Sequence, residues 1–168
     1  MELRTEERKA LDALIITKLE DRGVSLRQIG ELTYFLQEKY YKTLTVDDCV
    51  ENVKAVLKKR EVQNAILTGI QLDELAEKKM LDYPLQDMVE KDYSLYGIDE
   101  ILAFSIVNVY GSIGFTNFGY IDKVKPGILK EIDRKDDEKS VCHTFLDDLV
   151  GAVAAAAASR IAHSEQFE

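Results

Sequence analysis

The sequence lacks tryptophan, and its 168 residues include only two prolines, two cysteines and nine glycines. Two cysteines, Cys49 and Cys142, without a CxxC pair do not form a disulfide framework and do not indicate a zinc site. Because proline and glycine are scarce, we expect little of the chain to be loop. Basic residues are fewer than acidic ones: the sequence has 22 Lys and Arg and 31 Asp and Glu, which gives a net charge of −9. This negative charge disfavours nucleic acid as a partner and simple adhesion to an anionic membrane.

Targeting and membrane-spanning signals are also missing. The N-terminal stretch MELRTEERKALDALI is charged throughout and has no apolar signal-peptide core. Residues 101–121 carry no charge and are about as long as a bilayer span, but Ser, Asn and Thr side chains and three glycines interrupt them. We expect a buried helix to about Tyr110, then a glycine-rich bend, and no transmembrane segment. The sequence predicts a cytoplasmic protein, at most transiently and peripherally in contact with the inner face of the membrane.

Apolar residues recur at helical spacing along the chain, and no stretch alternates as a strand would. Expected helices cover residues 6–21, 26–41 after a cap at Ser25, 46 to about 69 after a cap at Thr45, and two shorter runs at 72–80 and from Pro84. We therefore expect an all-α, compact single-domain bundle of about seven or eight helices with a buried central helix. The domain would span residues 1–168, with an amphipathic helical half at 1–93 and an acidic-motif half at 94–168.

Three acidic pieces in the second half are the candidates for chemistry. They are Asp99–Glu100 in YGIDEILA, Asp122 with Lys123 and Lys125 in YIDKVKPGI, and Asp147–Asp148 in FLDDLVGA. In the first and third pieces a small residue, Ala103 or Gly151, follows about one turn later on the same helix face. Small side chains there leave room beside the acids for a ligand or for another backbone.

Each acidic pair also has an interpretation without chemistry. Thr144 and Asp147 match a capping box, and both acids of that pair would lie in a first helical turn, where the dipole favours negative charge by about 0.3–1 kcal/mol. The pair in YGIDEILA could start a helix capped by Ser94. The cap at Thr144 does not need Asp148, however, and a nearly uncharged apolar run follows the first pair. Carboxylates buried there require a partner or a cation.

If the three pieces converge, four or five negative charges share one place. Like charges at close range raise one another's pKa and destabilise the fold unless a cation lies between them. Oxygen-only ligands favour Mg²⁺, with Mn²⁺ or Ca²⁺ as alternatives, over zinc. Mg²⁺ leaves room for a substrate phosphate, for which Lys123 and Lys125 would be the counter-charges. The spacing thus favours a divalent-metal site suited to phosphoryl chemistry.

In their order along the chain these pieces resemble the phosphatidylglycerophosphatase A family. The resemblance is carried by IDEILA at 98–103, IDKVKPGILKEID at 121–133 and TFLDDLVGAVAAA at 144–156. It covers roughly residues 96–160, and the fit through ILTGIQLDELAEKK upstream is vaguer. The chain lacks the glycine-rich segment and the several apolar spans of the membrane members. It looks like the short soluble branch of the family found in Gram-positive bacteria.

The resemblance implies a Mg²⁺-dependent phosphatase that removes the terminal phosphate of phosphatidylglycerophosphate or of a soluble analogue. By the same resemblance, the metal ligands would be Asp99, Glu100, Asp122, Asp147 and Asp148. The catalytic residues would be Asp122, Lys125 and Asp148, with Lys125 as the phosphate clamp. Asp133 also matches a family aspartate, to which the resemblance assigns no role.

Smaller signals leave alternatives open. His143 would orient a carboxylate, join the metal or lie at the surface, and His163 is expected to be exposed. The small-residue run 151–159 would pack inside the monomer or form a contact in a homo-oligomer. Residues 133–140 read as a solvated loop. A second functional hypothesis is a non-catalytic helical regulatory or assembly module, in which the acids are caps and ion-pair partners.

Overall fold

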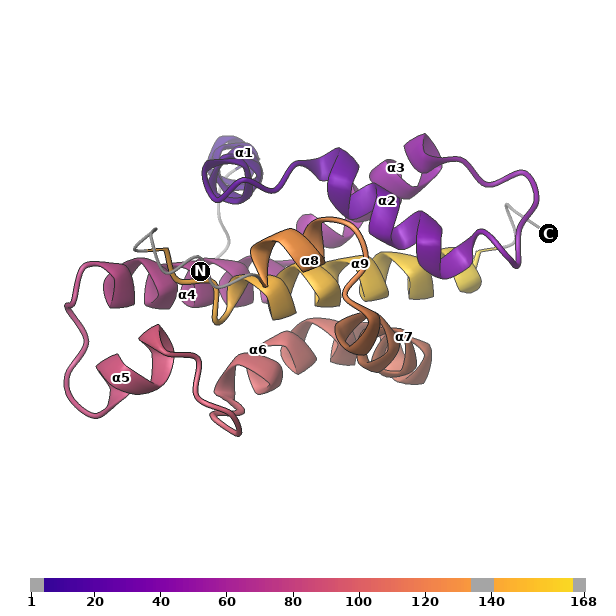
Figure 1. Cartoon of the computed structure of the whole chain (residues 1–168). Helices are drawn as coiled ribbons and strands as arrows, with labels where there is room; N and C mark the ends of the chain where they lie inside the picture. Colours follow the sequence, from indigo (N-terminus) through magenta and orange to yellow (C-terminus); the bar gives the residue numbers. More distant parts are fainter. Residues whose placement is uncertain (1–4, 134–140, 165–168) are drawn as a thin grey trace.

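The computed structural model describes residues 5–133 and 141–164, and every regular element in these ranges is a helix (Figure 1). In chain order the elements are α1 (Thr5–Asp21), α2 (Leu26–Gln37), α3 (Val46–Leu57), α4 (Arg60–Glu77), α5 (Leu85–Glu90), α6 (Ile98–Val107), the 3₁₀ turn η1 (Asn108–Tyr110), α7 (Gly111–Val124), α8 (Ile128–Ile132) and α9 (Leu146–Ala162). The expected all-α class is confirmed. Most of the predicted loop at 133–140 lies outside the described residues.

Helix α9 is the buried centre of the bundle. From Leu146 to Ile161 only Asp147 and Arg160 are not buried. In Figure 1 this helix runs through the middle of the molecule, and it packs against α2 and α3 on one side and against α6 and α7 on the other. Small side chains at 152–158 let these neighbours approach closely. The run is fully buried inside the monomer, which leaves no surface for an oligomer contact through it.

The predicted helix starts at Ser25 and Thr45 are confirmed. Each side chain accepts a hydrogen bond from the backbone three residues on, and the side chain there returns the bond, which completes a capping box. The expected continuous helix from 46 to about 69 is wrong, because the chain breaks between α3 and α4. At this break the Gln63 side chain donates to the Leu57 carbonyl at 2.9 Å and so satisfies the end of α3. Most of the run expected separately at 72–80 instead belongs to α4.

The uncharged stretch forms two helices, where the sequence predicted a helix and a bend. The backbone turns at Gly111, whose φ of 75° separates α6 and η1 from the rest of α7. The expected bend is wrong beyond this point, because Phe118 and Ile121 pack against Gly151 of α9 and stabilise a helix there.

Burial of this stretch is only partial. Ile98–Val124 is the one part of the described chain that is long and apolar enough to cross a membrane, and 28% of its most apolar window is buried. Ile101 on α6 and Tyr120 on α7 are exposed. The expected burial of the helix that ends near Tyr110 is therefore only partly right, because α6 buries Ala103, Ile106 and Val107 and keeps an apolar outer face. The buried central helix of the bundle is α9.

Candidate metal and phosphate site

Asp122 and Lys125 occupy the C-terminal end of α7, three residues apart. Pro126 follows, and a proline cannot continue a helix because it lacks the N–H that the next turn requires. Lys125 takes a left-handed conformation with φ 47° and ψ 56°, and its N–H still donates to the Ile121 carbonyl at 2.8 Å. The piece D-K-V-K-P therefore ends the helix with one carboxylate and one ammonium held side by side.

Asp147 and Asp148 lie in the first turn of α9. The predicted capping box is wrong, because the Thr144 hydroxyl donates to the carbonyl of Val89 at 2.5 Å instead of accepting from the helix. The residue in the cap position is Phe145, which has no capping side chain. Asp147 accepts the backbone N–H of Asp148 in its own first turn, whereas the causes of the Asp148 pKa include no such backbone hydrogen bond. Asp148 in particular is therefore left for another role.

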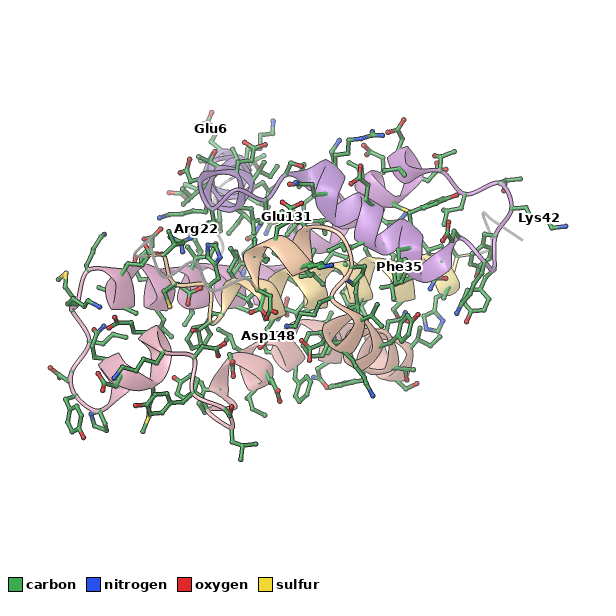
Figure 2. All side chains as sticks on the ribbon, in the orientation of Figure 1. Glu6, Arg22, Phe35, Lys42, Glu131 and Asp148 are labelled. Carbon is green, nitrogen blue, oxygen red and sulfur yellow. The ribbon has the colours of Figure 1, made fainter. Side chains whose placement is uncertain are left out.

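The two helix ends bring carboxylates together around Lys125. Oxygens of Asp122, Asp147 and Asp148 all lie within 4.8 Å of one another. The Lys125 Nζ lies 2.6 Å from Asp147 Oδ2 and 3.0 Å from Asp122 Oδ1. Asp133, at the end of α8, is a third ion-pair partner of this ammonium at 3.5 Å. In Figure 2 Asp148 lies near the middle of the view, between α8 and α6.

Burial and mutual repulsion oppose the ionisation of the α9 carboxyls. Asp148 is only 6% exposed, and its pKa is raised above its ordinary value first by burial and then by three neighbouring aspartates. These neighbours are Asp147, Asp122 and Asp99. Burial also raises the pKa of Asp147, against the lowering effect of Lys125. For Lys125, burial favours the neutral amine, but its ion-pair partners outweigh burial and raise the pKa. The cluster holds more carboxylates than one ammonium offsets.

The acidic pair of α6 is divided between the cluster and the surface. Asp99 is close enough to Asp122 and Asp148 for their charges to interact, and its pKa is raised mainly by burial. Its Oδ1 is buried and has no hydrogen-bond partner among the described residues. Glu100 is exposed, and the structure does not bring it to the cluster. A helix turns by about 100° from one residue to the next, which directs Glu100 away from its neighbour.

The donor set fits a hard divalent cation. Carboxylate oxygens are the ligands that Mg²⁺ and Mn²⁺ prefer, and three of them within 4.8 Å of one another can reach one ion. A buried carboxylate oxygen without a hydrogen-bond donor, as at Asp99, is costly unless a positive charge is near it. The cluster of Asp122, Asp147 and Asp148 could therefore hold a metal ion.

The remaining candidates lie around the cluster. His143 is half-buried and donates from Nδ1 to the Ile132 carbonyl at 3.0 Å, and burial lowers its pKa. It lines an open polar pocket together with Asp133 and Asp147. Lys123 is exposed, so Lys125 is the lysine of this piece that the fold directs into the cluster. His163 is exposed, as the sequence predicted.

One residue beside the site, Asp73, belongs to none of the acidic motifs predicted from the sequence. Asp73 on α4 is fully buried and accepts the backbone N–H groups of Phe145 and Leu146 at 3.1 and 3.0 Å, at the start of α9. Burial raises its pKa to about 7, and these hydrogen bonds act against that rise. A signal for it exists in the sequence. Asp73 follows Ile66 and Ile70 at helical spacing on the buried face, where an acid is out of place without a partner.

Fold and site together define a class: an all-helical bundle in which a carboxylate cluster with one partly buried lysine lies between the end of α7 and the start of the central helix α9. The sequence pattern of the phosphatidylglycerophosphatase A family matches the chain over residues 22–163. The protein belongs to this family, which confirms the resemblance of its acidic motifs. Family membership suggests a phosphatase-like function.

Similar proteins are found in Bacillus and Listeria. Uncharacterized protein YutG of Bacillus subtilis (strain 168) is 61% identical over 158 residues, which cover 94% of both chains. The structure of the low temperature requirement C protein from Listeria monocytogenes is 61% identical, covers 92% of this chain and 96% of its own, and superposes with a TM-score of 0.88. The structure of protein ypjQ from Bacillus subtilis is 55% identical, covers 95% of this chain and 97% of its own, and has a TM-score of 0.89.

Proposed function

We propose that this protein is a Mg²⁺-dependent phosphatase that hydrolyses a phosphate monoester, either phosphatidylglycerophosphate or a soluble analogue of it. The observation that carries the proposal is the grouping of Asp122, Asp147 and Asp148 within 4.8 Å of one another, beside the Lys125 ammonium. Phosphoryl transfer depends mainly on positioning and on offsetting negative charge, and such a cluster can supply both. Membership of the phosphatidylglycerophosphatase A family supports the same chemistry.

The residues of the cluster would divide these tasks. Asp122, Asp147 and Asp148 hold the ion, and Asp99 adds a fourth negative charge beside them. When bound, Mg²⁺ supplies Lewis-acid polarisation of the phosphoryl group and a bound water of lowered pKa. Lys125 exchanges its ion pair with Asp147 for a phosphate oxygen and offsets the charge that develops there. Asp122 or Asp148 would accept a proton from the attacking water.

A lipid substrate is supported by the surface next to the site. The apolar side chains of Leu95, Ile98 and Ile101 are exposed, and they flank Asp99 in the sequence. Such side chains can contact acyl chains at a membrane surface, whereas the net charge of −9 opposes approach to an anionic bilayer. Phosphatidylglycerophosphate in vesicles and water-soluble glycerol phosphate should therefore be assayed side by side.

The test is Mg²⁺-dependent phosphate release from these two substrates by the wild type, Asp122→Asn and Asp148→Asn. We expect each variant to lose turnover by about 100-fold or more while its helical circular dichroism is unchanged. Glu100→Gln is the matched control, because Glu100 is an acid of the same motifs that lies exposed outside the cluster. Unchanged turnover in both Asn variants would remove the catalytic assignment.

The second candidate function is the non-catalytic helical module. It is favoured by the ion pairs that Lys125 makes with Asp122, Asp133 and Asp147, since acids in that role need no metal. Calorimetric titration with Mn²⁺ separates the two functions. A module would give no saturable heat and no rise in melting temperature, whereas a metal site that binds only the folded protein stabilises it.

A further inference from the structure

Helix α9 begins without a cap from its own sequence. Its cap residue Phe145 supplies no side-chain hydrogen bond, whereas α2 and α3 begin with the capping side chains of Ser25 and Thr45. The N–H groups at the start of α9 are accepted instead by a carboxylate of another helix. The N–H of Phe145 lies 3.1 Å from Asp73 Oδ1 and 3.3 Å from its Oδ2, and the N–H of Leu146 lies 3.0 Å from Oδ2.

The segment before α9 is tied to α4 at a second point. Glu77, one turn after Asp73 on α4, accepts the N–H of Cys142 at 2.8 Å. Arg22 from the end of α1 donates to Glu77 at 3.0 Å and to the carbonyl of Cys142 at 2.6 Å. Two carboxylates on the same face of α4 therefore hold the stretch 142–146 at both of its ends.

The backbone that Asp73 binds leads directly into the candidate metal ligands. We propose that Asp73 is a positioning residue of the metal site, which holds the first turn of α9 so that Asp147 and Asp148 present their oxygens to Asp122. The inference deepens the proposed function and rests on it, because it concerns the same site.

The form of this cap favours positioning over simple stabilisation of a helix. A buried carboxylate loses hydration and is a costlier cap than the partly exposed Ser25 or exposed Thr45 of the other helices. A hydroxyl stands close by at Thr144, but it donates to Val89. A cap from α9 itself would order only its own turn. A cap from α4 also fixes where that turn lies relative to the rest of the bundle.

The test compares Mn²⁺ affinity by calorimetry in the wild type, Asp73→Ala, Asp73→Asn and Thr45→Ala. Asp73→Ala should weaken Mn²⁺ binding by roughly 10–100-fold, the loss typical of residues that orient metal ligands, and kcat/KM should fall with it. Asp73→Asn keeps an acceptor oxygen for the two N–H groups, so its loss should be smaller but still more than about twofold. Thr45→Ala removes a cap far along the chain from the acidic motifs and should leave the affinity unchanged.

Hydrogen exchange of backbone amides, measured without metal, gives an independent readout. The amides of residues 145–148 should exchange faster in Asp73→Ala and, to a lesser degree, in Asp73→Asn, while the remainder of α9 keeps its protection.

Wild-type Mn²⁺ affinity in a folded Asp73→Ala, or an equal loss of affinity in Thr45→Ala, would overturn the inference. If Asp73→Ala does not fold, wild-type affinity and exchange in Asp73→Asn overturn it. A wild type that binds Mn²⁺ but releases no phosphate refutes the proposed function alone. A wild type that binds no Mn²⁺ also refutes the metal role of Asp73, and the exchange data then show only whether it fixes the turn.

Discussion

The Nζ of Lys125 lies 2.6 Å from Oδ2 of Asp147, a residue 22 positions later in the chain and on another helix. The Asp147 side chain is 12% exposed and that of Lys125 is 26% exposed, so water screens this ion pair weakly. The pair joins the end of α7 to the start of α9. Its ammonium pairs with Asp122 and Asp147, two of the three carboxylates that would hold a divalent cation, so we expect the two cations to compete for these side chains.

This competition predicts opposite effects of one substitution on binding and on turnover. Lys125→Met should raise Mn²⁺ affinity by about tenfold or more, because a positive charge beside Asp122 and Asp147 is removed. The same variant should lose phosphate release, because no ammonium is left to contact the phosphate. Calorimetry and a phosphate assay on one preparation check both effects.

Lys123→Met is the control for that experiment, since Lys123 is an exposed lysine of the same motif. It should change neither quantity by more than about twofold. A fall in Mn²⁺ affinity in Lys125→Met would mean that the ammonium helps to assemble the site and does not compete with the metal.

The buried aspartates predict an unusual pH dependence of stability in the metal-free protein. The folded-state pKa of Asp148 is raised above its ordinary value, mainly by burial, so the folded protein keeps a proton that the unfolded chain releases. Stability should therefore fall as the pH rises from about 4 through the raised pKa, and Asp73, with a pKa of about 7, acts in the same direction. Urea denaturation at several values between about pH 5 and pH 8 measures this slope.

Two comparisons assign part of that slope to Asp148. Asp148→Asn, which cannot ionise, should show a shallower fall in stability with pH, and Glu100→Gln should keep the wild-type slope. Saturating Mg²⁺ should also flatten the slope of the wild type, because it binds the ionised carboxylate. A slope that is the same in Asp148→Asn and the wild type would show that Asp148 titrates normally.

Metal binding should release protons for the same reason. Mn²⁺ requires ionised ligands, while the raised pKa of Asp148 keeps this carboxyl at least partly protonated in the metal-free protein. Titration near neutral pH in two buffers of different ionisation enthalpy should give different heats, and the difference should correspond to at most about one proton per site. Equal heats in both buffers would mean that all the ligands are already ionised.

Local signals account for what the sequence predicted correctly about the fold. Ser25 and Thr45 each cap a helix with a partner three residues away, so four consecutive residues contain the whole interaction. The start of α9 follows no such rule. Its cap comes from Asp73, 72 positions before Phe145, and the local match at Thr144 was misleading because tertiary packing gave that hydroxyl another partner.

In the candidate site, too, the sequence predicted some features correctly, and others depended on tertiary structure. The acidic motifs pointed to Asp122, Asp147 and Asp148, and the structure groups these three. Spacing did not separate Asp99, which is half-buried, from the exposed Glu100, because helix orientation decides which of two adjacent acids faces inward. The glycine-rich α7 was likewise missed, since its propensity is weak and its helix depends on contacts with α9.

The start of α9 can also be disturbed at Gly69 of α4, one turn before Asp73. A Cβ on Gly69 would lie 2.5 Å from the Leu149 methyl Cδ1 and 3.0 Å from the Cβ of Phe145. The methyl can rotate away, but the Cβ of Phe145 moves only with the backbone of the cap. Gly69→Ala should therefore lower the free energy of unfolding by about 1–3 kcal/mol. It should weaken Mn²⁺ binding as well, because the displaced backbone leads into Asp147.

Gly119→Ala on α7 is the matched substitution for this prediction. A Cβ there meets no atom within 4 Å, and Gly119 lies inside an exposed part of the helix. Alanine should stabilise the protein by about 0.5–1 kcal/mol, because glycine loses more backbone freedom on folding, and Mn²⁺ affinity should not change. Chemical denaturation and calorimetry measure the two quantities. If Gly69→Ala lowers stability but keeps the wild-type Mn²⁺ affinity, the predicted loss of metal binding is wrong. The added methyl group would then displace only the Leu149 side chain, and the first turn of α9 would not have moved.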